Sequence, residues 1–394
     1  MVKGVLPLGY KANGLACGIK KSGKFDLGLI FSQEPAGAIG LFTANKIISG
    51  SVRLSQIHLK KSYPFRAIII NSGNANCFTP IEKATQKIKK QELTEKGSLR
   101  SAQQVVNNLS QLLRIEKHQI LFASTGIIGQ ALPVNRIKKA APELVKGLSQ
   151  SGLGKAAEAI MTTDTFTKVS TAAINIGRKL VTVCGLAKGA GMIAPNLIPK
   201  ATMLGFILSD ADITPRALRL AFKKAVDNSF NCITVDGCMS TNDSVFLISN
   251  SCANNPRIHP GSRDFNKFSS ALNYVCLDLA KMIVKDAEGS SKFIQINVKQ
   301  AKNFKEAKRA ALSVANSNLF KTAMFGRSRN FGRIVAALGA SGVDVKEECL
   351  KIKVSPLKKP EICVEIMLGM GKCEASVYTS DLTPEYIKIN AEYS

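Results

Sequence analysis

The sequence has 394 residues, of which 45% are hydrophobic and 30 are glycine. This length predicts roughly two domains or one large layered domain, and the composition is typical of a globular enzyme rather than a disordered chain. No apolar run approaches the roughly 18 residues that a membrane-spanning helix needs. The N-terminus also lacks the apolar core and small-residue cleavage site of a secretory signal. The sequence therefore predicts a cytoplasmic protein.

The net charge of +26 raises the question of an acidic partner. Nucleic-acid binding requires clustered Lys and Arg, often with aromatic residues that stack on bases. Here the lysines are spread along the chain and are dense only at residues 83–96 and 299–309; aromatic residues make up 6%, and Trp is absent. This pattern favours solvated helix faces and a cleft that attracts anionic substrates. A basic nucleic-acid-binding protein is the hypothesis from another functional class, but no nucleic-acid or membrane partner is expected.

Cysteine and histidine contribute little to the predicted chemistry. The ten cysteines are scattered without a C-x-x-C pair, which disfavours a zinc site and a disulfide framework. None of the three histidines, His58, His118 and His259, lies near a G-x-S-x-G nucleophile elbow. We therefore expect no metal site and no histidine base.

The apolar pattern predicts an α+β layered fold, because non-alternating buried strands are mixed with amphipathic helices. Strands are expected at residues 25–31, 38–42, 66–71, 120–124, 172–176, 180–186, 203–209, 293–298, 361–368 and 374–378. Helices are expected at about 80–114, 134–148, 215–226, 265–285 and 304–317. Residues 231–243 are interpreted as a further strand followed by polar turns.

A glycine-rich, proline-broken loop at residues 187–196 leads into an apolar stretch headed by Thr202. A self-processing enzyme places its nucleophile in such a position. If the Ala201–Thr202 bond breaks, Thr202 carries both a hydroxyl and a free α-amine, which can serve as nucleophile and general base. The alternative interpretation is a loop that enters a buried strand.

Three further segments carry polar groups that could support such chemistry. Ser124–Gly129 ends a strand with Thr125 and Gly126, where backbone N–H groups and a hydroxyl could face a developing oxyanion, or where glycine could serve turn geometry alone. Residues 161–168 hold four threonines, one carboxylate and one ammonium, more than helix capping explains. Glu288 lies at a predicted helix end, either as a surface residue or as the partner of a substrate ammonium.

Together these segments resemble the ornithine acetyltransferase family of arginine biosynthesis, also known as glutamate N-acetyltransferases. The resemblance covers nearly the whole chain and follows the order of the family's motifs. The motifs are Asn71–Asn76, Ser124–Gly126, Thr162–Thr165, Lys188–Met192, Ala201–Leu204, Asp286–Gly289 and Lys388–Tyr393.

The resemblance implies a layered α-β-β-α sandwich, similar to N-terminal-nucleophile hydrolases, that cleaves itself into an α chain (1–201) and a β chain (202–394). It assigns Thr202 as the nucleophile. It also implies assembly of the cleaved chains as an α2β2 heterotetramer. The other implied site residues are Thr125 and Gly126 for the oxyanion hole, and Thr162, Lys188, Thr202, Glu288, Asn390 and Ser394 for substrate binding.

The implied reaction transfers the acetyl group of N2-acetylornithine to glutamate through an acetyl-threonine. By charge, we expect Lys188 to bind the substrate carboxylate and Glu288 the ornithine ammonium. No metal or tightly bound cofactor is needed, and acetyl-CoA is expected as a second donor. The alternative is a related self-cleaving aminopeptidase or amidohydrolase, in which water replaces glutamate as the acceptor.

Four departures from the family pattern stand in this sequence. The run Leu197–Lys200 lengthens the cleavage loop, which predicts slower processing. Cys238-Met239 replaces an Asp-Thr pair. Within residues 325–333, Ser328-Arg329 replaces Asp-Pro and Phe331 replaces Trp. The chain stops at Ser394, one residue short of the family's terminal hydroxyl, which weakens the case for Ser394 as a ligand.

Overall fold

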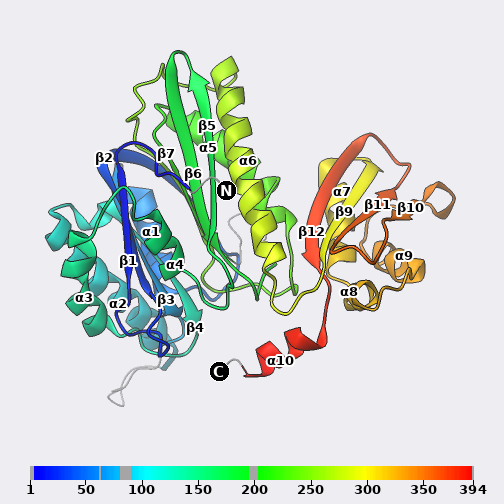
Figure 1. Cartoon of the computed structure of the whole chain (residues 1–394), viewed down its shortest axis with the longest axis horizontal. Helices are drawn as coiled ribbons and strands as arrows, with labels where there is room; N and C mark the ends of the chain where they lie inside the picture. Colours follow the sequence, from blue (N-terminus) through cyan, green and yellow to red (C-terminus); the bar gives the residue numbers. More distant parts are fainter. Residues whose placement is uncertain (1–3, 62–63, 80–89, 195–202, 393–394) are drawn as a thin grey trace. The chain divides into compact units, whose positions relative to one another are not determined.

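The computed structural model describes residues 4–61, 64–79, 90–194 and 203–392. Its contacts divide the chain into two compact units (Figure 1). Unit 1 is the described part of residues 1–189, 196–228 and 239–279, and unit 2 is the described part of 190–195, 229–238 and 280–394. No helix among the described residues is both long enough and apolar enough to cross a membrane.

Unit 1 is built on a mixed sheet in the order β4-β3-β2-β8-β7-β6-β5, with β1 paired to β2. Its strands are β1 (Tyr10–Leu15), β2 (Leu27–Phe42), β3 (Phe65–Asn74), β4 (Ile120–Ile127), β5 (Lys168–Ile176), β6 (Lys179–Lys188), β7 (Leu204–Ser209) and β8 (Ser244–Ser249). The helices that begin in this unit are α1 (Gly50–Lys61), α2 (Lys90–Leu113), α3 (Val134–Lys146), α4 (Leu153–Ala159), α5 (Pro215–Asp227) and α6 (Arg263–Lys285).

Strand β2 connects the two halves of this sheet. Its first half pairs with β1 and β3, and residues 37–42 pair with β8. The prediction of two short strands at 25–31 and 38–42 was wrong, because one continuous strand covers both. Pro35 lies where the β2–β3 register shifts, and there its missing N–H removes no ladder hydrogen bond.

The alternation of apolar side chains in the strands produces the layers of unit 1. In β3, Ile68 and Ile70 join a core shared with Phe206 and Leu208 of β7. Ile69, on the opposite face of β3, packs with residues of α2 and α3. On the other side of the unit, a Cβ added at Gly185 of β6 would lie 2.6 Å from Leu279 and 2.8 Å from Val275 of α6. Helices therefore cover both outer faces, and the predicted α-β-β-α layering is confirmed.

Unit 2 has a smaller sheet in the order β10-β11-β9-β12. Its elements are β9 (Phe293–Ala301), α7 (Phe304–Ala315), α8 (Asn318–Phe325), α9 (Phe331–Gly339), β10 (Lys351–Val354), β11 (Glu361–Met367), β12 (Cys373–Ser380) and α10 (Pro384–Glu392). Ile294, Ile296 and Val298 alternate along β9 into a core with α7 to α9. The strand expected at the start of 231–243 is absent: residues 230–232 form a 3₁₀ turn, and Ile233 makes an isolated bridge to Tyr378.

Candidate functional site

Thr125 and Gly126 are held at the end of β4 by its parallel neighbour. Ser72 of β3 is paired with Thr125, and Gly73 is paired with Gly126. Gly126 has a φ of +130°, and a Cβ there would lie 2.3 Å from the Gly73 carbonyl carbon. No other residue fits without displacing the backbone, since a separation under 3.0 Å is a clash. The strand continues to Ile127, so both residues belong to a paired strand and not to the expected turn.

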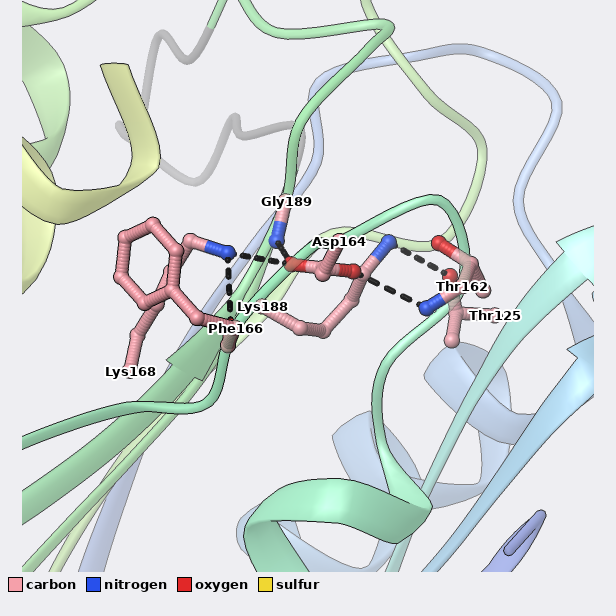
Figure 2. A network of polar contacts seen from close by, with 7 residues as sticks. All are labelled: Thr125, Thr162, Asp164, Phe166, Lys168, Lys188 and Gly189. Atoms are coloured by element: carbon pink, nitrogen blue, oxygen red, sulfur yellow. Dashed lines mark hydrogen bonds and ion pairs between the residues drawn. The ribbon is translucent and has the colours of Figure 1, made fainter. Parts of the chain in front are cut away.

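Lys188 is the last residue of β6 and is buried. Its Nζ donates a hydrogen bond to Thr125 Oγ1 at 3.3 Å (Figure 2). An ammonium group is costly to bury unless polar or charged groups surround it. The structure therefore brings together two of the predicted site residues, and it places a cation directly at the Thr125 hydroxyl.

Asp164 connects this pair to the predicted Thr162 (Figure 2). Its Oδ1 accepts hydrogen bonds from Lys168 Nζ and from the Gly189 backbone N–H, each at 2.7 Å. Its Oδ2 accepts the Thr162 N–H at 2.9 Å. The Asp164 and Lys168 side chains are completely buried. The carboxylate therefore ties the start of β5 to the end of β6, where Lys188 lies.

The charges around Asp164 keep it ionised. Burial raises the pKa of its carboxyl, but the ammonium groups of Lys188 and Lys168 and the hydrogen bonds from Lys168 and the Thr162 N–H outweigh burial and lower the pKa to about 2. The density of polar residues at 161–168 is visible in the sequence, but no role for Asp164 was predicted from it. The signal that could have identified Asp164 is its spacing of four residues from Lys168 within a threonine-rich segment.

In unit 2, the predicted Glu288 and Asn390 also come together. Asn390 Nδ2 of α10 donates to Glu288 Oε2 at 2.9 Å and to the Tyr386 carbonyl at 3.0 Å. The Glu288 N–H donates to the Ala190 carbonyl at 3.1 Å. A Cβ added at Gly191 would lie 2.2 Å from Glu288 Oε2, so the carboxylate lies directly over this glycine.

Asp236 anchors the segment that precedes the predicted cleavage loop. Its carboxylate accepts the N–H groups of Met192 at 2.6 Å and Ile193 at 2.9 Å, and the Tyr386 hydroxyl at 3.3 Å. Burial, followed by the Asp236 charge, raises the pKa of Tyr386. Met192 has a φ of +55°, a conformation that the two N–H contacts help to maintain. Sequence reasoning missed Asp236, which follows an apolar run and precedes a glycine.

The remaining predicted site residues are Ala201, Thr202 and Ser394, and they lie outside the described residues. Their roles stay predictions. Among the residues that the structure describes, no group of three or more His, Cys, Asp or Glu side chains could hold a metal ion.

Comparison with known proteins gives the relationship of the whole chain. The model of the ArgJ family matches residues 11–394. The chain belongs to the ArgJ family. It is 40% identical over 406 residues to the arginine biosynthesis bifunctional protein ArgJ of Geobacter sulfurreducens, covering 98% of both chains. It is 39% identical over 417 residues to the glutamate N-acetyltransferase of Methanocaldococcus jannaschii, covering 98% of this chain and 97% of that protein.

Among solved structures, the arginine biosynthesis bifunctional protein argJ of Bacillus halodurans is similar to this chain at 36% identity, with a TM-score of 0.47. The match covers 49% of this ArgJ-family chain and 100% of the other. The predicted family is confirmed by the full-length match of the family model and by the two relatives.

Proposed function

We propose that this chain transfers the acetyl group of N2-acetylornithine to glutamate in arginine biosynthesis, releasing ornithine and forming N-acetylglutamate. The observation that carries this proposal is the match over 98% of the chain to relatives named bifunctional ArgJ and glutamate N-acetyltransferase. The clustering of the predicted residues Thr125, Thr162 and Lys188 in unit 1 supports it.

The proposed reaction begins with self-cleavage of the Ala201–Thr202 bond, which gives the α chain 1–201 and the β chain 202–394. The Thr202 hydroxyl then attacks the acetyl carbonyl and passes its proton to the Thr202 α-amine. As the tetrahedral intermediate collapses, the Thr202 ammonium returns this proton to the amide nitrogen, the C–N bond breaks, and ornithine leaves with a free α-amine. The α-amine of glutamate attacks the acetyl-threonine and regenerates the Thr202 hydroxyl.

The surrounding groups have distinct roles in this proposal. Thr125 and Gly126 stabilise the oxyanion of each tetrahedral intermediate, and the nearby Lys188 ammonium adds positive charge. Lys188, with Thr162, binds the substrate carboxylate. Glu288, oriented by its hydrogen bond from Asn390, binds the side-chain ammonium of ornithine. Ser394 is the remaining substrate-binding candidate, at the chain end.

Several further properties belong to the proposal. The enzyme needs no cofactor, acetyl-CoA serves as a second acetyl donor to glutamate, and the cleaved chains assemble as an α2β2 heterotetramer in the cytoplasm.

The test of the proposed reaction is an assay of purified protein with N2-acetylornithine, with and without glutamate. The proposal expects ornithine and N-acetylglutamate in equal amounts when glutamate is present. Sustained ornithine release without glutamate would instead identify an amidohydrolase.

A further inference from the structure

The loop between β1 and β2 forms backbone hydrogen bonds to the buried carboxylate of Asp26. Asp26 Oδ1 accepts the N–H of Cys17 at 2.6 Å, and its Oδ2 accepts those of Ile19 at 2.6 Å and Lys20 at 3.0 Å. Lys20 Nζ donates to the Phe25 carbonyl at 2.5 Å. Among the residues that the structure describes, this is the single hydrogen-bond partner of the Lys20 ammonium, which has three N–H donors.

This loop places Lys20 beside the end of β4. A Cβ added at Gly73 would lie 3.0 Å from Ile19 Cγ2 and 3.1 Å from Lys20 Cγ. Gly73 is in turn paired with Gly126, and the two glycine backbones are in contact. Lys20 is therefore separated from the Thr125–Gly126 segment by one residue that has no side chain.

Several charged groups act on the Lys20 ammonium. The carboxylates of Asp26 and Asp164 and the ammonium groups of Lys188 and Lys24 interact electrostatically with it. Lys168 is paired with Asp164 at 2.7 Å, and both Asp26 oxygens are engaged by backbone N–H groups. The Lys20 ammonium is therefore partly buried near other cations, and a substrate carboxylate bound there would add a compensating negative charge.

The electrostatic coupling supports the same arrangement. Burial lowers the pKa of Lys20 to about 8; Asp26 and Asp164 oppose this shift, and Lys188 and Lys24 add to it. Lys20 and Lys188 thus repel each other in the substrate-free chain. A bound carboxylate would relieve this repulsion, because an anion between two cations stabilises the charge of both.

We propose that Lys20 is a further substrate-binding residue, which together with Lys188 binds the carboxylate that N2-acetylornithine and glutamate share. This inference rests on the proposed function, since it names a second ligand for the same substrates. Lys20 acts on binding and takes no part in proton transfer. Loss of the Lys20 charge therefore weakens the binding of N2-acetylornithine and the binding of glutamate by a similar factor.

The test compares Lys20→Met, Lys20→Arg and Lys21→Met with the wild-type enzyme. Met keeps most of the aliphatic stem and removes the charge, Arg keeps the charge, and Lys21 is an exposed neighbour in the same loop. We expect Lys20→Met to raise KM for both substrates about tenfold or more, with kcat changed less than about threefold. Lys20→Arg recovers most of this loss, and Lys21→Met behaves as the wild type.

Unchanged KM values in a folded Lys20→Met enzyme would overturn the inference, as would an equal loss in Lys21→Met. If Lys20→Met does not fold, Lys20→Arg and Lys20→Gln, which keep and remove the charge, replace it in the comparison. A loss in Lys20→Arg as large as that in the uncharged variant would assign Lys20 a packing role and also overturn the inference. Wild-type protein that transfers no acetyl group would instead refute the proposed function itself, and the inference with it.

Discussion

At position 126 of the candidate site, the backbone conformation and the neighbouring strand require glycine. Its φ of +130° lies in a region that L side chains rarely adopt, and the Gly73 backbone occupies the place of a Cβ. Gly129, three residues later, also has a positive φ, of +91°, but nothing lies within 4 Å of its Cβ position. Substitutions at the two glycines therefore distinguish the cost of backbone strain alone from the cost of strain combined with steric overlap.

We expect Gly126→Ala to lower the free energy of unfolding by about 3 kcal/mol or more, and Gly129→Ala by about 1 kcal/mol. Both substitutions strain the backbone, but only the first also pushes β3 and β4 apart. Gly126→Ala should abolish acetyl transfer, whereas Gly129→Ala should retain it. Urea denaturation and the transfer assay measure the two effects. Equal losses of unfolding free energy in the two variants would contradict the steric overlap between a side chain at position 126 and the Gly73 backbone.

At the scale of elements, Asp164 joins the start of β5 to the end of β6. The Gly189 N–H, one residue beyond Lys188, and the Lys168 ammonium at the start of β5 converge on the same carboxylate oxygen. The position of Lys188 thus depends on a segment more than twenty residues earlier in the chain. A buried carboxylate with two cationic neighbours is also a source of pH-dependent stability.

We expect Asp164→Asn to lower the unfolding free energy by about 3 kcal/mol at pH 7, because it removes the carboxylate that pairs with the buried Lys168 ammonium. The folded pKa of Asp164, about 2, lies below its ordinary value of 3.8. Its stabilising contribution is therefore complete above about pH 4 and is lost as the pH falls toward 2. The difference in unfolding free energy between wild type and Asp164→Asn should stay constant from pH 7 to about pH 4 and become smaller below pH 4.

The control for this series is Asp264→Asn, which breaks a partly exposed ion pair with Lys267. Exposed pairs contribute about 0 to 1 kcal/mol, so this variant should remain close to wild type at pH 7. Urea denaturation at each pH provides the comparison. If Asp264→Asn lowers the unfolding free energy at pH 7 as much as Asp164→Asn does, the destabilisation is not specific to the buried Asp164–Lys168 pair.

For the whole molecule, sequence periodicity predicted most of the long elements. The strand at 66–71, the helix at 134–148 and the helix at 265–285 correspond to β3, α3 and α6 within a few residues. The strand expected at the start of residues 231–243 was wrong, because buried apolar residues in an irregular segment have no period that separates them from a strand. Two predicted strands proved to be the single β2, since the glycines inside it do not interrupt pairing.

The site was predicted less completely than the fold. The resemblance named Thr125, Lys188, Glu288 and Asn390 as site residues without predicting their contacts. In the structure Lys188 contacts Thr125 and Asn390 contacts Glu288, and the roles of these residues stay predictions. Asp236 and Lys20 were missed because their contacts with Met192, Ile193 and Gly73 join segments that are distant in sequence. Such contacts leave no local pattern in the chain.

The predicted cleavage lies between β6 and β7, which are adjacent antiparallel strands of unit 1. If the Ala201–Thr202 bond breaks, the two products therefore share one sheet, and the pairing of Lys188 with Leu204 persists. Cleavage at this bond would therefore free the predicted nucleophile without dividing the core of unit 1. The compact units and the predicted α and β chains are thus different divisions of the molecule.

The most direct test of this account is intact mass spectrometry of the freshly purified protein, quenched after mixing with N2-acetylornithine in the absence of glutamate. The account predicts two fragments, the second beginning at Thr202 and heavier by one acetyl group, which disappears when glutamate is added. Thr202→Ala should give a single uncut chain without an acetyl group. A wild-type chain that stays uncut, or one that transfers acetyl groups without ever carrying one, would contradict the acetyl-threonine mechanism.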